Sequence, residues 1–370
     1  MLNSSSGVFC GERLELARNF RGMTQSALGK EVSASGASIS YYETGKQTDP
    51  PSDLVEAWGE VLGFEPGFFF ERVDDPFRDE ECSFRHRRSA PEHLKRRARS
   101  FGTLIGLIIH YLSGRLELPA YDIPVKPTNG RADGIEEAAQ ACRAHWKLGL
   151  DTPITNIGRT LENAGVPVIK TLASTEKVDA FSRRGRVPVV IVNTFKESPS
   201  HWIFDMAHEL GHFVCHTDRI TGSVDTEREA DAFASAFLLP SRAFSREFKS
   251  APFSWEHMLR LKARWHVSLA AMVYRAYSLG LMDAITYRRS FKYLSARGWR
   301  KNEPGEPVAH EPELLRESLM TLYQELGEHP LVMCQRLNFT PQTFKDLTGI
   351  DVPAPAENHH SVVRFQRPTQ

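Results

Sequence analysis

The stretch "FDMAHELGHFVCH", residues 204–216, contains the pattern H-E-x-x-H at His208, Glu209 and His212. Apolar residues around it recur with a period near 3.6, which predicts an α-helix. Side chains four positions apart on a helix lie one above the other, so both imidazoles can reach one Zn²⁺ at about 2.0–2.1 Å. Glu209 lies about 100° around the helix, where a carboxylate can take a proton from water and pass it to a leaving amine. The motif therefore predicts a catalytic metal centre.

Two further observations bear on this prediction. The chain holds 14 histidines, so chance gives the pattern in roughly a few per cent of similar sequences, and a helix with surface histidines is the ordinary alternative. A catalytic zinc site also needs a third protein ligand. Residues 225–240, "DTEREADAFASAFLLP", predict a second helix on which Glu229 shares a face with small residues, so a carboxylate there can approach the metal. Asp218 excludes the arrangement with a third histidine ten residues after His208.

Short amphipathic segments fill residues 11–64. Thr24 and Ser35 each precede one of these segments, and both are expected N-caps because their hydroxyl groups can accept a backbone N–H. Four or five short helices within about 55 residues are typical of a helix-turn-helix bundle.

A change of period along the middle of the chain predicts a small sheet between helices. An amphipathic helix is expected over residues 135–148. Strands are expected over Val166–Thr171, around the "DAFS" of residues 179–182, and over Val187–Val192. The predicted fold class is therefore mainly α with a small antiparallel sheet, an α+β arrangement.

Changes in composition divide the chain into four segments. We expect a helix-turn-helix domain in residues 1–75, a linker and a long helix in 76–120, a domain that carries the H-E-x-x-H motif in 121–290, and a C-terminal helical region with a frayed tail in 291–370. The arginine-rich run of residues 84–100 is expected to lead into the exposed start of the long helix rather than to form a nucleic-acid patch.

Bulk composition limits the location and the partners. The formal net charge is zero, which by itself predicts neither a nucleic-acid nor a membrane partner. The longest apolar run, "FGTLIGLIIHYL", is shorter than the roughly 18 residues that a bilayer span needs, and the N-terminus lacks the features of a signal peptide. The five cysteines are scattered and form no C-x-x-C pair, which is typical of a reducing cytoplasm. We therefore expect a cytoplasmic protein without membrane contact.

Residues 11–64 resemble the XRE-type, λ-repressor-like helix-turn-helix family. The likeness is carried by "MTQSALGKEV", "SGASIS" and "YETGKQTDP". The resemblance implies contacts with double-stranded DNA by the following residues: Gln25, Ser35, Gly36, Ala37, Ser38, Tyr41 and Lys46. The first 75 residues carry six Lys and Arg against twelve Asp and Glu, whereas DNA-binding domains are usually basic. Recognition of a protein alone by this module therefore stays open.

From about Ser83 to Arg288, the chain resembles the ImmA/IrrE family of zinc metallo-endopeptidases, which have a thermolysin-like (gluzincin) design. Seven motifs carry the likeness in the same order as in that family: "SFRHRR", "PITNIGRTLENAGVPV", "DAFS", "PVVIVN", "FDMAHELGHFVCH", "EREADAFASAFLLP" and a W-x-V-S helical tail at Trp265–Ser268. Several motifs in the right order are much more specific than H-E-x-x-H alone.

The ImmA/IrrE resemblance assigns roles to residues of the two motif helices. It implies a bound Zn²⁺ with three protein ligands: His208, His212 and Glu229. Glu209 takes the role of the catalytic base, and Glu227 and Asp231 are near alternatives for the third ligand. The strand Val187–Val192 is expected to border the cleft and to pair with the substrate backbone, as edge strands of such peptidases do.

Together the two resemblances imply a regulatory, site-specific endopeptidase that cleaves a partner repressor or regulator and is targeted by its N-terminal module. One alternative is a DNA-binding transcriptional regulator whose peptidase fold serves for sensing or docking. Another is an antitoxin-like interaction protein. Glu209 favours the enzyme, because a scaffold needs no base beside two metal ligands. Homodimerisation stays open.

Overall fold

The computed structural model describes residues 7–78, 82–84, 91–128, 130–171, 180–194, 198–217, 219 and 221–353. Its N-terminal part is a bundle of short helices: α1 (Gly11–Phe20), α2 (Gln25–Glu31), α3 (Gly36–Glu43), α4 (Ser52–Leu62) and the 3-10 helix η1 (Pro66–Phe70). The hydroxyl groups of Thr24 and Ser35 accept hydrogen bonds from the backbone N–H of Ala27 and Ser38. Both predicted caps are confirmed, and they frame the turn that separates α2 from α3.

One long helix, α5 (Glu92–Ser113), follows the bundle. The described part of the arginine-rich run forms the first turns of this helix, as predicted. Glu92 in the first turn pairs with Arg99 at 3.0 Å. The preceding part of that run, residues 85–90, lies outside the described residues. From Leu104 onward most side chains of α5 are buried. Within the described ranges, no helix is both long enough and apolar enough to span a bilayer.

Four short strands form one sheet: β1 (Cys82–Phe84), β2 (Val168–Thr171), β3 (Ala180–Arg183) and β4 (Val189–Asn193). Their order is β1-β3-β4-β2; the pairs β1–β3 and β3–β4 are antiparallel, whereas β2–β4 is parallel. The α+β fold class is confirmed, but the expectation of a purely antiparallel sheet is wrong. β2 pairs with the outer side of β4 instead of joining β3, and short apolar strands have the same sequence pattern in either arrangement.

Strand β4 lies inside the sheet. Its Ile191 is opposite Phe181 of β3 on one side and Ile169 of β2 on the other. A strand with a neighbour on each side has no free edge for another chain. The expectation that Val187–Val192 pairs with a substrate backbone is therefore wrong.

The sheet separates two hydrophobic cores. Successive residues of a strand face opposite sides; Val189 and Ile191 of β4 pack into the first core, and Val190 and Val192 into the second. The following helices surround the second core: α6 (Ala132–His145), α7 (Ile157–Asn163), α8 (Pro199–Cys215), α9 (Val224–Leu238), α10 (Ser241–Phe248), α11 (Trp255–Trp265), α12 (Leu269–Ser278) and α13 (Ala284–Ala296).

The first core joins the helix-turn-helix bundle to the C-terminal helices. These helices are α14 (Leu314–Gln324), α15 (Pro330–Leu337) and α16 (Pro341–Thr348). The rings of Phe64 and Phe339 lie with their centroids 5.7 Å apart, and Arg21 donates hydrogen bonds of 2.5 Å to Thr343 and to Asp346. The bundle therefore shares one apolar core with α5, the C-terminal helices and one face of the sheet.

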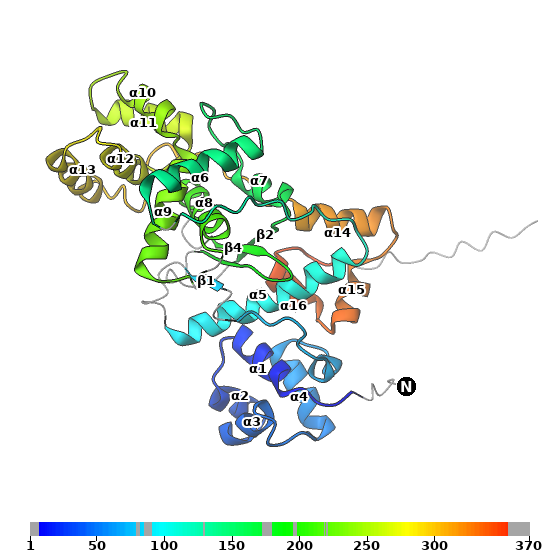
Figure 1. The fold of residues 1–370 in the computed structure, drawn as a ribbon. Coiled ribbons are helices and arrows are strands. Elements are labelled where there is room, and N and C mark those ends of the chain that lie inside the picture. Colours follow the sequence, from blue (N-terminus) through cyan, green and yellow to red (C-terminus); the bar gives the residue numbers. More distant parts are fainter. Residues whose placement is uncertain are drawn as a thin grey trace, which may run out of the picture.

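Two groups of helices lie at opposite ends of the molecule (Figure 1). The bundle, with α2 and α3 outermost, forms one end, and α10–α13 form the other. Helix α5 and the sheet lie between them. The two ends can therefore contact different partners.

Candidate metal centre and helix-turn-helix face

Helices α8 and α9 carry the motif residues and pack closely together. Ser223 and Thr226 form a capping box that fixes the start of α9. Gly211 on α8 is a point of close approach, since a Cβ there would lie 3.1 Å from Phe233 Cδ1 and 3.2 Å from Ala230 Cα. Glycine therefore lets α9 come near enough for its carboxylates to reach the histidines of α8.

Three potential ligands converge between these helices. His208 Nε2 lies 3.1 Å from His212 Nε2. The carboxylate of Glu227 reaches both nitrogens, with Oε2 3.4 Å from His208 Nε2 and Oε1 3.4 Å from His212 Nε2. In a tetrahedral zinc site with bonds of about 2.0–2.1 Å, ligand atoms lie roughly 3.3 Å apart. Two imidazole nitrogens and one carboxylate at these distances therefore fit Zn²⁺ in both chemistry and spacing.

Glu229 lies outside this group. Its carboxylate accepts hydrogen bonds from Thr128 at 3.1 Å and Arg219 at 2.6 Å, and it lies 3.2 Å from His216 Nε2. Residues two apart on a helix point about 200° apart, so Glu227 and Glu229 cannot both face the histidine pair. The expectation of Glu229 as third ligand is corrected: the alternative, Glu227, occupies that place.

The protonation states also suit a metal. Burial alone would raise the pKa of the Glu227 carboxyl, but the imidazoles of His208 and His212 bring this pKa below its ordinary value. Burial lowers the pKa of His212 to about 3. At neutral pH the site therefore presents an ionised carboxylate and a neutral imidazole at these positions, which are the forms that bind metals.

Asp231, the other alternative, lies behind a histidine and not among the ligand atoms. Its Oδ1 is 2.8 Å from His208 Nδ1. When Nδ1–H donates to this carboxylate, the lone pair of Nε2 is left free to bind a metal. Glu227 and Asp231 are four residues apart and therefore lie on one face of α9.

A chain of polar contacts lies behind His212. Its Nδ1 is 2.9 Å from His216 Nδ1, and His216 Nε2 is 3.2 Å from Glu229, which Arg219 holds. Burial lowers the pKa of His216 to about 4, so this ring is neutral at pH 7. Its Nε2–H then donates to Glu229 and its Nδ1 accepts from His212, which leaves His212 Nε2 free to bind. The only sequence signal for His216 is its spacing of four residues from His212.

Glu209 is fully buried on α8, next to the ligand pair in sequence. Ser182 on β3 donates a hydrogen bond from its Oγ to Glu209 Oε2. This bond fixes the carboxylate between helix and sheet, which suits a group that must accept a proton in one geometry. The "DAFS" motif includes Ser182, but the sequence analysis assigned this serine no role, because its contact joins a strand to a helix.

Most of the residues expected to contact DNA lie on the outer face of the bundle. Ser35, Ala37, Tyr41 and Lys46 are exposed, and Ser38 is half-buried. Lys46 Nζ lies 5.3 Å from the centre of the Tyr41 ring. These residues are on α3 or next to it, at the end of the molecule away from the metal centre (Figure 1). A duplex can therefore approach them without meeting α8 or α9.

Two of the expected DNA contacts lie where helices of the bundle meet. Gln25 donates a hydrogen bond of 2.7 Å to Glu43, which is also paired with the buried Arg18 at 2.5 Å. A Cβ on Gly36 would lie 2.8 Å from Ser26 Oγ. Both residues therefore hold α2 and α3 together in this structure, a role that the sequence analysis missed.

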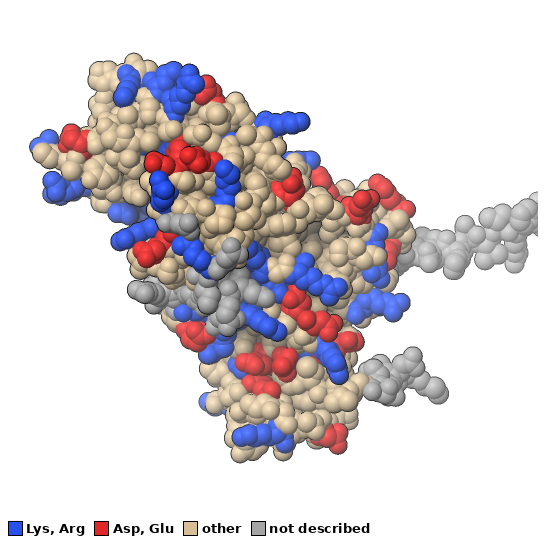
Figure 2. Space-filling model, viewed as in Figure 1, with Lys and Arg blue, Asp and Glu red and all other residues tan. Residues whose placement is uncertain are grey.

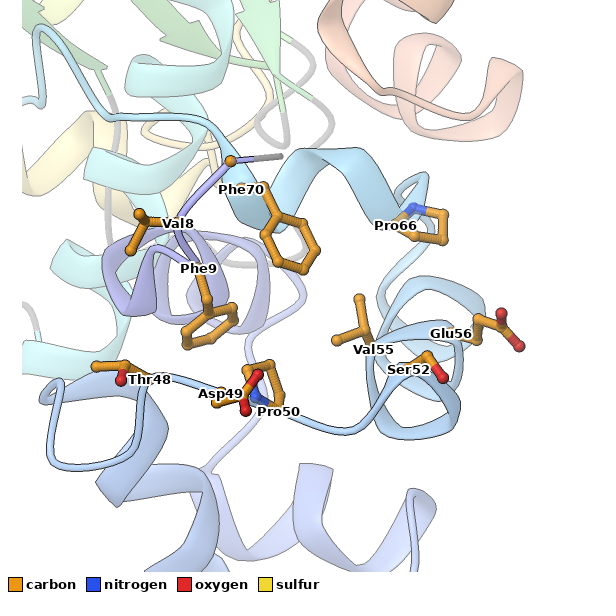
Figure 3. Close-up of a pocket in the computed structure, with 11 residues that line it drawn as sticks. Val8, Phe9, Thr48, Asp49, Pro50, Ser52, Val55, Glu56, Pro66 and Phe70 are labelled. Atoms are coloured by element: carbon orange, nitrogen blue, oxygen red, sulfur yellow. The ribbon is translucent and has the colours of Figure 1, made fainter. Parts of the chain in front are cut away.

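A separate hollow of about 480 Å³ lies beside α4 and η1 (Figure 3). Its wall includes the apolar side chains of Val8, Phe9 and Phe70, with Asp49 and Glu56 as its acidic members. None of its lining residues belongs to α3 or to the metal centre. It therefore takes no part in the site described above.

Comparison with protein families agrees with both halves of the structure. Residues 161–277 match the model of the IrrE N-terminal-like domain of the Peptidase_M78 family, and residues 10–67 match that of a helix-turn-helix domain. The first match includes β2–β4, α8 and α9, and therefore all three candidate ligands. No curated protein matches the chain. The chain thus joins a helix-turn-helix domain to a domain of a metallopeptidase family, as the two resemblances predicted.

Proposed function

We propose that this protein is a zinc-dependent endopeptidase that cleaves one partner protein, a repressor or another regulator. The observation that carries the proposal is the convergence of His208, His212 and Glu227 beside the buried Glu209. A scaffold would need neither the ligand spacing nor a buried carboxylate next to it.

Each residue of the site then has a distinct task. His208, His212 and Glu227 hold the metal, which when bound supplies a Lewis acid that polarises a carbonyl and makes water easier to ionise. Glu209 accepts the proton of the attacking water and delivers it to the leaving amine. Ser182 keeps the Glu209 carboxylate in one orientation.

The helix-turn-helix domain supports a regulatory role for this peptidase. It presents α3 at the end of the molecule away from the metal centre (Figure 1), so it can bind DNA or a DNA-bound partner while the peptidase domain remains accessible. Such binding raises the local concentration of a substrate on the same DNA. We place this activity in the cytoplasm, where a regulator of transcription acts.

The test uses Glu209→Gln, which removes the base and keeps the ligands. Affinity capture from the native host with this variant should retain a partner that the wild-type protein cleaves, and metal analysis should find about one zinc per chain in both forms. Glu256→Gln on α11, where the side chain is 85% exposed, is the matched control and should cleave like the wild type.

Two results would contradict the proposal that the protein is an endopeptidase. If Glu209→Gln cleaves the captured partner as fast as the wild type does, Glu209 is not the base. If the wild type binds zinc and the partner but leaves the partner intact, the domain serves for sensing or docking in a transcriptional regulator.

A further inference from the structure

Helix α13 and the turn after it carry an unusual concentration of positive charge. Six exposed cations lie between residues 284 and 302: Arg288, Arg289, Lys292, Arg297, Arg300 and Lys301. From Leu269 to Asn302 the only acidic residue is Asp283, which caps α13 with its own carboxylate. The chain as a whole has no net charge, so this surface is locally basic on a neutral protein.

Within the described part of the chain, no carboxylate pairs with these six cations, although Arg297 and Arg300 lie over aromatic rings. None of them makes an ion pair or a side-chain hydrogen bond there. Elsewhere in the same domain, cations such as Lys262 and Arg275 are buried against carboxylates. The charges of α13 therefore do not stabilise the fold through ion pairs and remain available to an external anion.

Aromatic rings lie between these charges and the neighbouring helix α12. Tyr277 stacks on Tyr287 with ring centroids 4.4 Å apart, and Phe291 follows Tyr287 at 4.9 Å. The guanidinium of Arg300 lies 5.5 Å from the centre of the Phe291 ring. Tyr274 and Tyr277 are each 42% exposed. Partly exposed aromatic rings are thus mixed with cations on one surface.

Some of these residues line a shallow hollow of about 620 Å³. Its lining consists of Tyr287, Arg288, Phe291, Lys292, Ser295 and Arg300. Residues 288, 291, 292 and 295 follow helical spacing, so they make one stripe along α13. In Figure 2, blue Lys and Arg atoms lie at the end of the molecule where Figure 1 places α13.

We propose that this α13 surface binds single-stranded nucleic acid. The cations complement a phosphate backbone, and the tyrosine rings offer faces on which unpaired bases can stack. The bases of a duplex are already stacked on one another, so the rings favour a single strand over double-stranded DNA. Its six cations lie beyond residue 277, where the peptidase-family match ends, and the surface is at the opposite end of the molecule from α3 (Figure 1). It is therefore separate from both the metal centre and the helix-turn-helix face.

The test measures fluorescence anisotropy of labelled oligonucleotides with the full-length protein. The probes are oligothymidylate and oligouridylate of about 20 nucleotides, which distinguish DNA from RNA, and a duplex of equal length. The triple variant Arg288→Gln, Lys292→Gln, Arg300→Gln should weaken single-strand binding at least about tenfold. The slope of log K against log salt is negative, and each lost phosphate contact makes it less steep by about 0.7. The triple variant should therefore show a slope that is about 2 less steep than that of the wild type.

A matched control removes the same charge elsewhere. Arg242, Lys249 and Arg316 are also exposed and unpaired within the described chain, and their triple replacement by Gln should leave single-strand binding within about twofold of the wild type. Tyr277→Leu keeps an apolar side chain but removes a stacking face, and it should weaken single-strand binding about tenfold.

Three outcomes would overturn the proposal. The first is no single-strand binding by the wild type at about 50 mM salt. The second is an equal loss of affinity for the single-stranded probes in the two triple variants. The third is unchanged binding in Tyr277→Leu together with competition by polyglutamate at the same charge concentration, which would assign the surface to an acidic protein segment.

Discussion

Ser182 on β3 donates a hydrogen bond to Glu209 on α8, so the sheet and the motif helix meet at the proposed base. We expect Ser182→Ala to lower kcat about tenfold, because loss of a hydrogen bond to a charged group costs about 1.4 kcal/mol or more. Zinc content should not change, since no ligand is touched. Ser182→Thr keeps the hydroxyl and should restore most of the rate. Loss of zinc from Ser182→Ala would instead show that the serine supports the fold of the site.

The two glutamates of α9 provide a matched pair. Glu227→Gln removes a ligand and should abolish stoichiometric zinc binding, whereas Glu229→Gln weakens only the support behind His212 and should reduce zinc affinity by about 10–100-fold. Competition with a chromogenic chelator measures both affinities. The reverse order of effects would return Glu229 to the role of third ligand.

Duplex binding by the helix-turn-helix domain can be tested with one surface charge. Ala37 is exposed at the start of α3, so Ala37→Glu places a carboxylate against DNA phosphates and should weaken promoter binding more than about tenfold. Ala263→Glu, at an exposed position of α11, is the control. Equal binding by both variants in an electrophoretic shift at low salt would favour recognition of a protein by this domain.

Glu162 on α7 should make stability depend on pH. Burial raises the pKa of its carboxyl to about 7, although its oxygens accept the backbone N–H of Glu313 and Leu314. The folded protein therefore keeps a proton that the unfolded chain releases near pH 4.5. This contribution to stability is fully present below about pH 4.5 and is lost as the pH rises to about 7, by up to about 3 kcal/mol.

Denaturant unfolding at pH 5 and pH 8 measures this effect. The wild type should lose more stability between the two pH values than Glu162→Gln, which has no proton to release. Equal losses in both proteins would mean that Glu162 titrates near its ordinary pKa in the folded state.

Local patterns in the sequence were sufficient to predict much of the fold. Thr24 and Ser35 were expected to cap helices because their hydroxyl groups act within three residues, and the structure confirms both. The spacing of His208 and His212 was sufficient to predict that their imidazoles lie close together, since helix geometry alone places side chains four residues apart on one face. The helix-turn-helix and peptidase domains were also predicted, because each has several motifs in a fixed order.

The third ligand could not be predicted in this way. Glu227 and Glu229 lie on opposite sides of the same helix, and the rotation of α9 about its own axis decides which one faces His208. That rotation depends on how α9 packs against α8, where Gly211 permits a close approach, and this packing is a tertiary interaction. The parallel pairing of β2 with β4 was missed for a similar reason, because strand order depends on contacts between distant segments.

The joining of the bundle to the C-terminal helices also affects how the chain is made. Thr340 donates a hydrogen bond to the carbonyl of Gly63, although 277 residues separate them. A ribosome that adds about 5–20 residues per second needs roughly 14–55 s to synthesise that interval. Until then, Phe64 lacks the ring of Phe339 that lies against it in the finished protein. The yield of folded protein should therefore depend on translation speed and on chaperones that cover the nascent bundle during this delay.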